Sequence, residues 1–216
     1  MYKPIATILL VALLISGCAA LDDGAEQNIT NNKANNSTNS SHSDEDQLPM
    51  AAIDPQQTVT DVINLLKDKD LPRLAAYVHP TEGVRFSPYG YVNTETDVIM
   101  QASILQNAFE DDSILDWGNY DGSGQSIDLS FADYYKKFIY DHDFVNADQV
   151  GYNTIIGTGN TANNATEVYS DSYIAEYHFK GTKANNFMDW SSLRIVLVEH
   201  NRDWVVVGII HDQWTI

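Results

Sequence analysis

Cysteine and positive charge are both scarce in this chain. Cys18 is the only cysteine among 216 residues, so the chain cannot form an internal disulfide. Twelve Lys and Arg residues stand against thirty Asp and Glu, which gives a formal net charge of −18 at pH 7. A surface this acidic repels nucleic-acid phosphates and anionic lipid headgroups. We therefore expect no nucleic-acid partner.

Recognisable metal-binding and catalytic motifs are also missing. The six histidines form no pair at the helix or strand spacing of metal ligands, and the consecutive residues Asp141, His142 and Asp143 point in different directions. No serine stands in a nucleophile elbow, and the loop at 157–160 lacks the lysine and the following helix of a phosphate loop. These absences predict no metal and no cofactor, and they favour a non-enzymatic protein while leaving an enzyme open.

The start of the chain has the pattern of a secretory signal. After Lys3, residues 5–15 form an apolar run of eleven residues, too short to span a bilayer, and Ser16, Gly17 and Cys18 follow it. The "ISGC" segment resembles the lipobox of bacterial lipoproteins, in which the chain is cleaved before an acylated cysteine. The resemblance implies a lipoprotein signal peptide at 1–17 and palmitate-type lipidation of Cys18. The alternatives are a plain signal peptide or a short core helix with a buried cysteine.

A polar tether is expected between this anchor and the folded part. From residue 22 to residue 47 the chain is mostly Asn, Ser, Thr, Asp and Glu with almost no large apolar residue, so it cannot bury enough apolar surface to offset ordering entropy. We predict a lipidated Cys18 and a disordered tether over 18–53, and a single globular domain over 54–216. The lipid would hold this domain at the extracytoplasmic face of the bacterial membrane, in the cell envelope.

The globular part places helices before strands. Apolar residues recur at helical spacing over 59–66 and 71–78, and Ser130 followed by Asp133 has the spacing of a capping box before an aromatic helix at 131–139. Strand patterns occupy 84–86, 97–100, 117–120, 126–129, 150–156 and 173–179, and the longest lie last, at 193–199 and 204–210. This order predicts an α+β fold, with N-terminal helices packed on a curved, mostly antiparallel sheet of about five or six strands.

The region from 79 to 214 also resembles a family of uncharacterised bacterial lipoproteins. The resembling segments are "HPTEGVRFSPYGYV", "WGNYDGSG", "FADYYKKFIYDHDF", "EYHFKG" and "MDWSSLRIVLVEHNRDWVVVGIIHDQWTI". More loosely, the fold is similar to the cone-like superfamily of nuclear transport factor two and ketosteroid isomerase. That superfamily includes enzymes and plain binding domains, so the resemblance implies a pocket between sheet and helices but no particular activity.

Acid–base chemistry is the reaction type that the residues leave open. A carboxylate or imidazole desolvated among aromatic rings can have its pKa moved toward neutrality. The candidates are His211, Asp212 and Arg85. Strict strand alternation over 204–212 puts even-numbered residues on one face and odd-numbered residues on the other. His211 and Asp212 therefore cannot line one pocket unless the strand ends between them.

Aromatic residues near polar ones are the candidates for ligand contact. Aromatic faces with polar rims bind sugars, peptides and apolar small molecules, although they also fill ordinary cores. The candidate ligand-binding residues are Tyr89, Trp117, His178, Arg194 and Trp214.

Taken together, the sequence favours a membrane-anchored lipoprotein that serves as a ligand-binding or envelope-interaction module. Its partner would be a small molecule, a glycan or an envelope protein. The alternative is a small hydrolase or isomerase using His211 or Asp212 with Arg85, and a third interpretation is a structural surface protein.

Overall fold

A computed structural model describes residues 54–215. The expected signal peptide, Cys18 and tether lie outside the described residues. Within the described part, no helix is long and apolar enough to cross a membrane.

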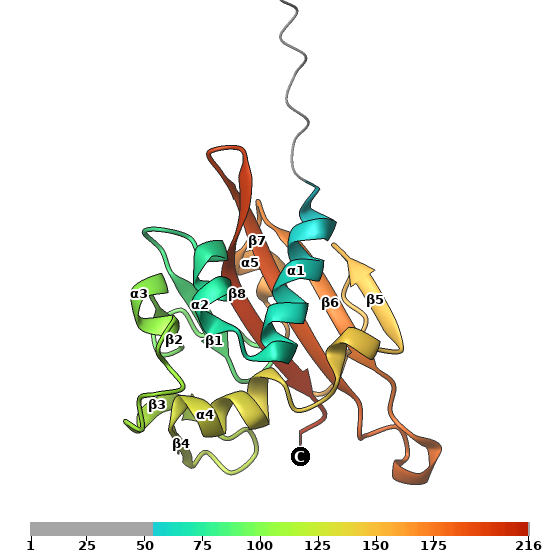
Figure 1. Ribbon diagram of the computed structural model, residues 1–216. Helices are drawn as coiled ribbons and strands as arrows, with labels where there is room; N and C mark the ends of the chain where they lie inside the picture. Colours follow the sequence, from blue (N-terminus) through green and yellow to red (C-terminus); the bar gives the residue numbers. More distant parts are fainter. Residues whose placement is uncertain (1–53, 216) are drawn as a thin grey trace, which may run out of the picture. The chain divides into compact units, whose positions relative to one another are not determined.

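Six strands form the main sheet, in the spatial order β2-β1-β8-β7-β6-β5 (Figure 1). All neighbouring pairs are antiparallel except β1 and β8, which run parallel. A second sheet pairs two further strands, β3 and β4. The bounds are β1 Val84–Ser87, β2 Val98–Met100, β3 Leu115–Asn119, β4 Ser126–Leu129, β5 Gln149–Tyr152, β6 Tyr173–Phe179, β7 Ser191–His200 and β8 Asp203–Gln213. The predicted α+β fold with a mostly antiparallel sheet is confirmed.

The helices are short except the first one. In α1, Pro55–Asp68, the Asp54 side chain caps the N-terminus by accepting a hydrogen bond from the Gln56 amide at 2.9 Å, and Lys69 ends the helix in the left-handed conformation. This helix lies across the sheet and contacts β6, β7 and β8 (Figure 1). The others are α2 Leu71–Leu74, η1 Ala75–Tyr77, α3 Ala102–Leu105, α4 Phe131–Tyr134, the π-helical η2 Tyr135–Ile139, η3 Phe144–Asn146, α5 Ala165–Val168 and η4 Lys183–Asn185.

The space between the sheet and α1, α4 and η2 is filled by side chains. Ser130 caps α4 as predicted, by accepting a hydrogen bond from the Asp133 amide. The aromatic rings that follow pack into the core, where Trp117 stacks on Tyr134 with ring centroids 3.7 Å apart and Phe86 meets both rings edge-on. The sheet–helix interior is therefore a packed core, so a ligand cavity has to lie elsewhere.

A bulge in β8 reverses the predicted alternation of its side chains. The register against β7 shifts between Val206 and Gly208, so Val207 is an extra residue. Even-numbered residues before the bulge and odd-numbered residues after it consequently share the helix-facing side, and the prediction of a single even-numbered face is wrong. His211 and Asp212 both follow the bulge and still point to opposite faces.

The opposite face of the sheet is covered by loops and α5. A small apolar cluster joins α5 to the sheet, where Ala165 and Val168 pack near Val207 and Ile210. Asn164 fastens this cover to the loop after β1, because its side chain accepts a hydrogen bond from the Val92 amide at 2.7 Å and donates one to the Val92 carbonyl at 3.0 Å. The loops at 88–97 and 153–172 thereby enclose a second, largely polar interior.

Candidate functional site

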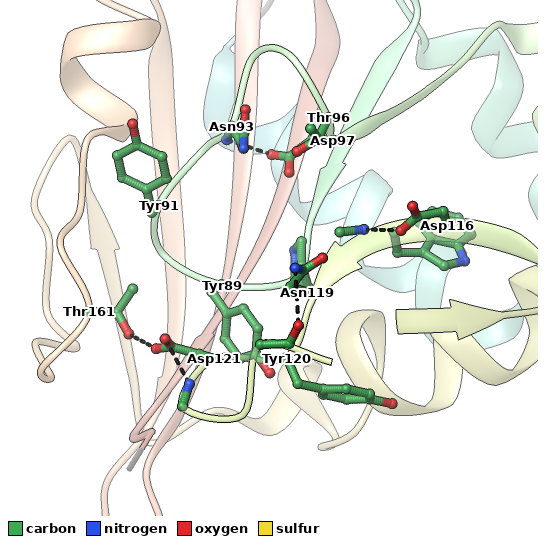
Figure 2. Close-up of a pocket in the computed structure, with 15 residues that line it drawn as sticks. Tyr89, Tyr91, Asn93, Thr96, Asp97, Asp116, Asn119, Tyr120, Asp121 and Thr161 are labelled. Atoms are coloured by element: carbon green, nitrogen blue, oxygen red, sulfur yellow. Dashed lines mark hydrogen bonds between the residues drawn. The ribbon is translucent and has the colours of Figure 1, made fainter. Parts of the chain in front are cut away.

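A cavity of about 520 Å³ lies between the loop after β1 and the β3–β4 hairpin (Figure 2). Its walls come from segments far apart in the sequence: residues 88–97, residues 116–124, and Thr161 from the loop that covers the sheet. The lining residues are Pro88, Tyr89, Tyr91, Asn93, Thr96, Asp97, Asp116, Trp117, Gly118, Asn119, Tyr120, Asp121, Gly122, Gly124 and Thr161. Its size is in the range of small-molecule sites.

The lining of this cavity is acidic and aromatic. Three carboxylates and three tyrosines surround it, with the buried Trp117 beneath, and none of the lining residues is Lys, Arg or His. Aromatic faces attract cations through their quadrupole, and carboxylates attract them by charge. Within residues 54–215, no group of three or more His, Cys, Asp or Glu side chains is arranged to hold a metal ion. The lining therefore suits an organic cation better than an anion.

Asp97 is positioned by the loop that carries it. One oxygen, Oδ2, accepts hydrogen bonds from the Ser87 hydroxyl and from the Asn93 amide, the latter at 2.9 Å. Burial raises the pKa of Asp97, while these hydrogen bonds and the nearby Arg85 oppose the rise. Arg85 itself donates through Nη1 to the carbonyls of Asn93, Thr94 and Asp97 at 3.3–3.4 Å. The guanidinium thus holds the loop in place.

Asp116 and Asp121 are fixed at the opposite wall. Oδ2 of Asp121 accepts hydrogen bonds from the hydroxyls of Thr161 and Thr215, which hold the pKa of this carboxyl below its usual range. Oδ1 of Asp116 accepts a hydrogen bond from the Gly118 amide at 2.9 Å. Among the described residues, no donor reaches Oδ2 of Asp116 or Oδ1 of Asp97, so each wall keeps a carboxylate oxygen available to a ligand.

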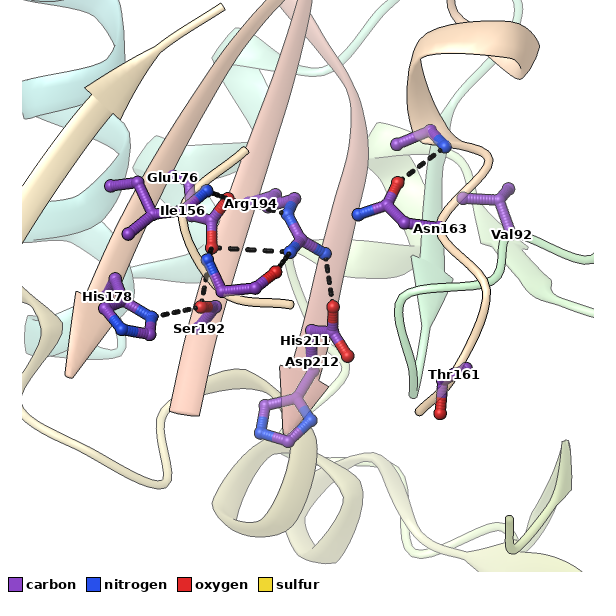
Figure 3. A network of polar contacts seen from close by, with 12 residues as sticks. Val92, Ile156, Thr161, Asn163, Glu176, His178, Ser192, Arg194, His211 and Asp212 are labelled. Carbon is purple, nitrogen blue, oxygen red and sulfur yellow. Dashed lines mark hydrogen bonds and ion pairs between the residues drawn. The ribbon is translucent and has the colours of Figure 1, made fainter. Parts of the chain in front are cut away.

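A buried ionic network lies on the sheet face that the loops and α5 cover (Figure 3). Arg194 donates from Nε to Glu176 at 3.0 Å and from Nη1 to Asp212 at 2.8 Å. Glu176 also accepts hydrogen bonds from the backbone amides of Ile156 and Gly157, at 2.9 and 2.8 Å. A Cβ at position 157 would lie 2.5 Å from the Ser192 hydroxyl, which explains the glycine at this close approach. Every charge in this network has a partner, so the network holds the loop to the sheet.

A third polar cluster lies on the helix-facing side of the sheet end. His211 is buried and contacts the Pro88 carbonyl through Nδ1 at 3.1 Å and Asp141 through Nε2 at 3.3 Å. His142 Nδ1 approaches the same Asp141 oxygen at 2.9 Å. Burial raises the pKa of Asp141, but the hydrogen bonds and charges of the two histidines outweigh it and hold this pKa well below its usual range. The Asp141 contact raises the pKa of His142.

This cluster predicts a defined pH window for stability. Because the folded pKa of Asp141 is depressed, its stabilising effect is present above the unfolded value of about 4 and is lost as pH falls. Because the folded pKa of His142 is raised, its contribution is present below about pH 6.5 and is lost as pH rises through the folded value. Urea unfolding should show that Asp141→Asn costs most stability between these limits and progressively less as pH falls from about 4 toward the depressed folded pKa of Asp141. A stability difference that stays constant with pH would contradict the assignment.

The structure separates the residues predicted for acid–base chemistry. His211 lies among helix-facing side chains, Asp212 is paired with Arg194 on the other face, and Arg85 binds loop carbonyls. These three side chains do not meet at one cavity. Of the predicted ligand-binding residues, Tyr89 and Trp117 line the large cavity, His178 lines a smaller one, Arg194 is buried in the ionic network, and Trp214 is 37% exposed and lines neither cavity.

The carboxylates of the large cavity were missed at the level of sequence. Asp121 is the first residue of the predicted hairpin turn at 121–125, where an Asp is typical of turns, and Asp116 directly precedes the strand predicted at 117–120. Asp97 stands at the start of a predicted short strand, where the sequence indicates a solvent-exposed side chain. The signal that marks them is the recurrence of Tyr, Asn and Asp in "SPYGYVNTETD" and "DWGNYDG". Only the pairing of distant segments shows that both stretches face one cavity.

Comparisons with known proteins add little to this geometry. No family model matches the chain, and no curated protein matches its sequence. Among solved structures, the chain is similar to a protein named Rd1NTF2_05, with a TM-score of 0.29 and 11% sequence identity, over 73% of this chain and 96% of that one. The likeness is loose and carries no conclusion about function. The chain's own fold and site define an α+β domain with an acidic, aromatic cavity beside a packed sheet.

Proposed function

We propose that the chain is a bacterial lipoprotein whose folded domain binds a positively charged, hydroxyl-bearing small molecule, such as an amino sugar, in the 520 Å³ cavity. The observation that carries this proposal is the lining itself: three carboxylates and three tyrosines with no basic side chain among them. A cavity of this kind attracts a cation and disfavours an anion.

Each part of such a ligand has a matching group on the walls. An ammonium group would contact the available oxygen of Asp116 or, at the opposite wall, that of Asp97, in a charge-assisted hydrogen bond that is stronger than a neutral one. The ring of Tyr120 already attracts a cation on one side, since the Lys137 ammonium lies 4.3 Å from its centroid. The side-chain amides of Asn93 and Asn119 can both donate to and accept from sugar hydroxyls.

Binding should weaken when a single wall charge is removed. Replacing Asp116 with Asn keeps the shape of the side chain and its acceptor for the Gly118 amide, but removes the charge facing the ligand. A hydrogen bond to a charged group contributes roughly 1.5–3 kcal/mol, so calorimetry with a glucosamine disaccharide should show a dissociation constant about tenfold higher or more.

The matched control is Asp112→Asn, which removes the same charge from an exposed position outside the cavity. This variant should bind like the wild type. Equal weakening in both variants would show that only the overall acidity attracts the sugar, and would contradict a site in this cavity.

Anchoring is tested separately through Cys18. The apolar run, the small residues before the cysteine and the polar segment after it support lipidation at this position. Changing Cys18 to Ala should abolish palmitate labelling and move the protein from the membrane fraction to the soluble fraction, while the folded domain keeps its unfolding midpoint. Labelling that persists in this variant would contradict the anchor assignment.

A further inference from the structure

The buried network also fixes the proton arrangement of a histidine at its edge. The Ser192 hydroxyl carries one hydrogen and donates it to Glu176 Oε1 at 2.7 Å. Glu176 is held in place by Arg194 and by the Gly157 amide. Nδ1 of His178 lies 2.8 Å from the same Ser192 oxygen. Because the serine hydrogen is already engaged, Nδ1 must be the donor in this contact, which leaves the lone pair on Nε2.

The surroundings of His178 favour its neutral imidazole. Burial lowers the pKa of His178, and the charges of Arg194 and Lys180 lower it further, while those of Glu176 and Asp148 oppose the change. Figure 3 shows the ring beyond Ser192, at one end of the chain of contacts. Among the described residues, Nε2 has no hydrogen-bond partner. His178 therefore presents a hydrogen-bond acceptor whose orientation the network sets.

This acceptor lines a second cavity, of about 310 Å³, at the end of β6. Trp190 and Phe187 supply aromatic walls, and the ring of Trp190 lies 5.9 Å from that of His178. Among the residues that line this cavity, Lys180 is the only one with a formal charge when His178 is neutral. It stands two residues after His178, so the two side chains leave the same side of the extended chain roughly 7 Å apart.

We propose that this second cavity binds an aromatic acid that carries a hydroxyl or N–H donor on the far side of its ring. The ring packs against Trp190, the carboxylate pairs with the Lys180 ammonium, and the donor group binds Nε2 of His178. The ligand is opposite in charge to the one proposed for the large cavity, and no lining residue is shared between the two cavities. The two proposals therefore succeed or fail independently.

The probe that tests this site is 4-hydroxybenzoate, with benzoate and 4-hydroxybenzamide as analogues that each lack one recognised group. Tryptophan fluorescence or calorimetry should show binding of 4-hydroxybenzoate, and binding at least tenfold weaker for each analogue. His178→Phe and Lys180→Met should each weaken the binding of 4-hydroxybenzoate about as much as the loss of the matching group in the analogues does. Lys183→Met, a change to an exposed lysine on the same loop outside the cavity, should leave binding unchanged.

A second measurement on the unchanged protein avoids any effect of substitution on folding. Nitrogen-15 NMR of the histidine side chains should show His178 neutral at neutral pH, with Nδ1 protonated and Nε2 unprotonated. The Nε2 signal should shift when 4-hydroxybenzoate is added. A proton on Nε2 of the free protein, no binding of the probe, or binding that is the same in His178→Phe would each overturn the proposal.

Discussion

Replacing Arg194 with Met is expected to lower the free energy of unfolding by about 3–5 kcal/mol, because it leaves two buried carboxylates without their cation. Arg194 and Glu176 are fully buried, and Asp212 is nearly so. Methionine fills similar space but cannot donate the hydrogen bonds that Arg194 makes to Glu176, Asp212 and the Gly157 carbonyl. Urea denaturation at neutral pH measures the loss directly.

Two variants show whether this loss arises from unpaired charge. Arg85→Met removes a half-buried arginine that donates to backbone carbonyls, so its loss should be clearly smaller. Replacing Arg194, Glu176 and Asp212 together with Met, Leu and Leu should recover most of the stability, since buried ionic groups are often replaceable by apolar ones as a set. Equal losses in Arg194→Met and Arg85→Met would contradict the network's contribution to stability.

Replacing Trp117 with Ala is expected to cost about 3–5 kcal/mol of stability through the cavity that it opens. The ring is fully buried, stacks on Tyr134 and donates from Nε1 to the Leu129 carbonyl at 2.9 Å. The same ring supports the floor of the large cavity, so ligand binding should fall together with stability. Thermal unfolding gives the first quantity and calorimetric titration the second.

Trp214→Ala is the matched control for this change. Trp214 is the same residue type but is 37% exposed and lines neither proposed site, so its removal should cost far less and should leave binding intact. The stability of Trp117→Phe should fall between those of Trp117→Ala and Trp214→Ala, because this variant keeps an aromatic ring but loses the indole N–H donor. A Trp117→Ala protein as stable as Trp214→Ala would contradict the packing described for the core.

Local patterns in the sequence were enough to predict the architecture. Helical spacing over 59–66 corresponds to α1, and the two longest apolar runs correspond to β7 and β8. The faces of β8 were predicted wrongly, because alternation assumes an uninterrupted strand and Val207 is an extra residue in the pair. The one local signal of the bulge is Gly208, directly after Val207, because an isolated glycine inside a strand pattern often marks a bulge.

The sites depend on contacts that local patterns do not contain. Arg194 was a candidate because it stands at the start of the apolar strand predicted over 193–199, but its two carboxylate partners each lie 18 residues away along the chain. The segments that line the large cavity lie even farther apart along the chain, since Thr161 contacts Asp121 across 40 residues. Aromatic and acidic residues could be listed from the sequence as candidates, but which of them share one cavity is decided by the tertiary pairing of loops.

The most direct test of the proposed ligand site is amide chemical-shift mapping of the domain during titration with a glucosamine disaccharide and, in parallel, with its uncharged N-acetylated counterpart. The proposal predicts that the charged sugar shifts resonances at residues 88–97, residues 116–124 and Thr161, that added salt weakens the effect, and that the uncharged sugar produces much smaller shifts. Shifts of equal size for both sugars, or shifts that leave these three segments unchanged, would contradict it.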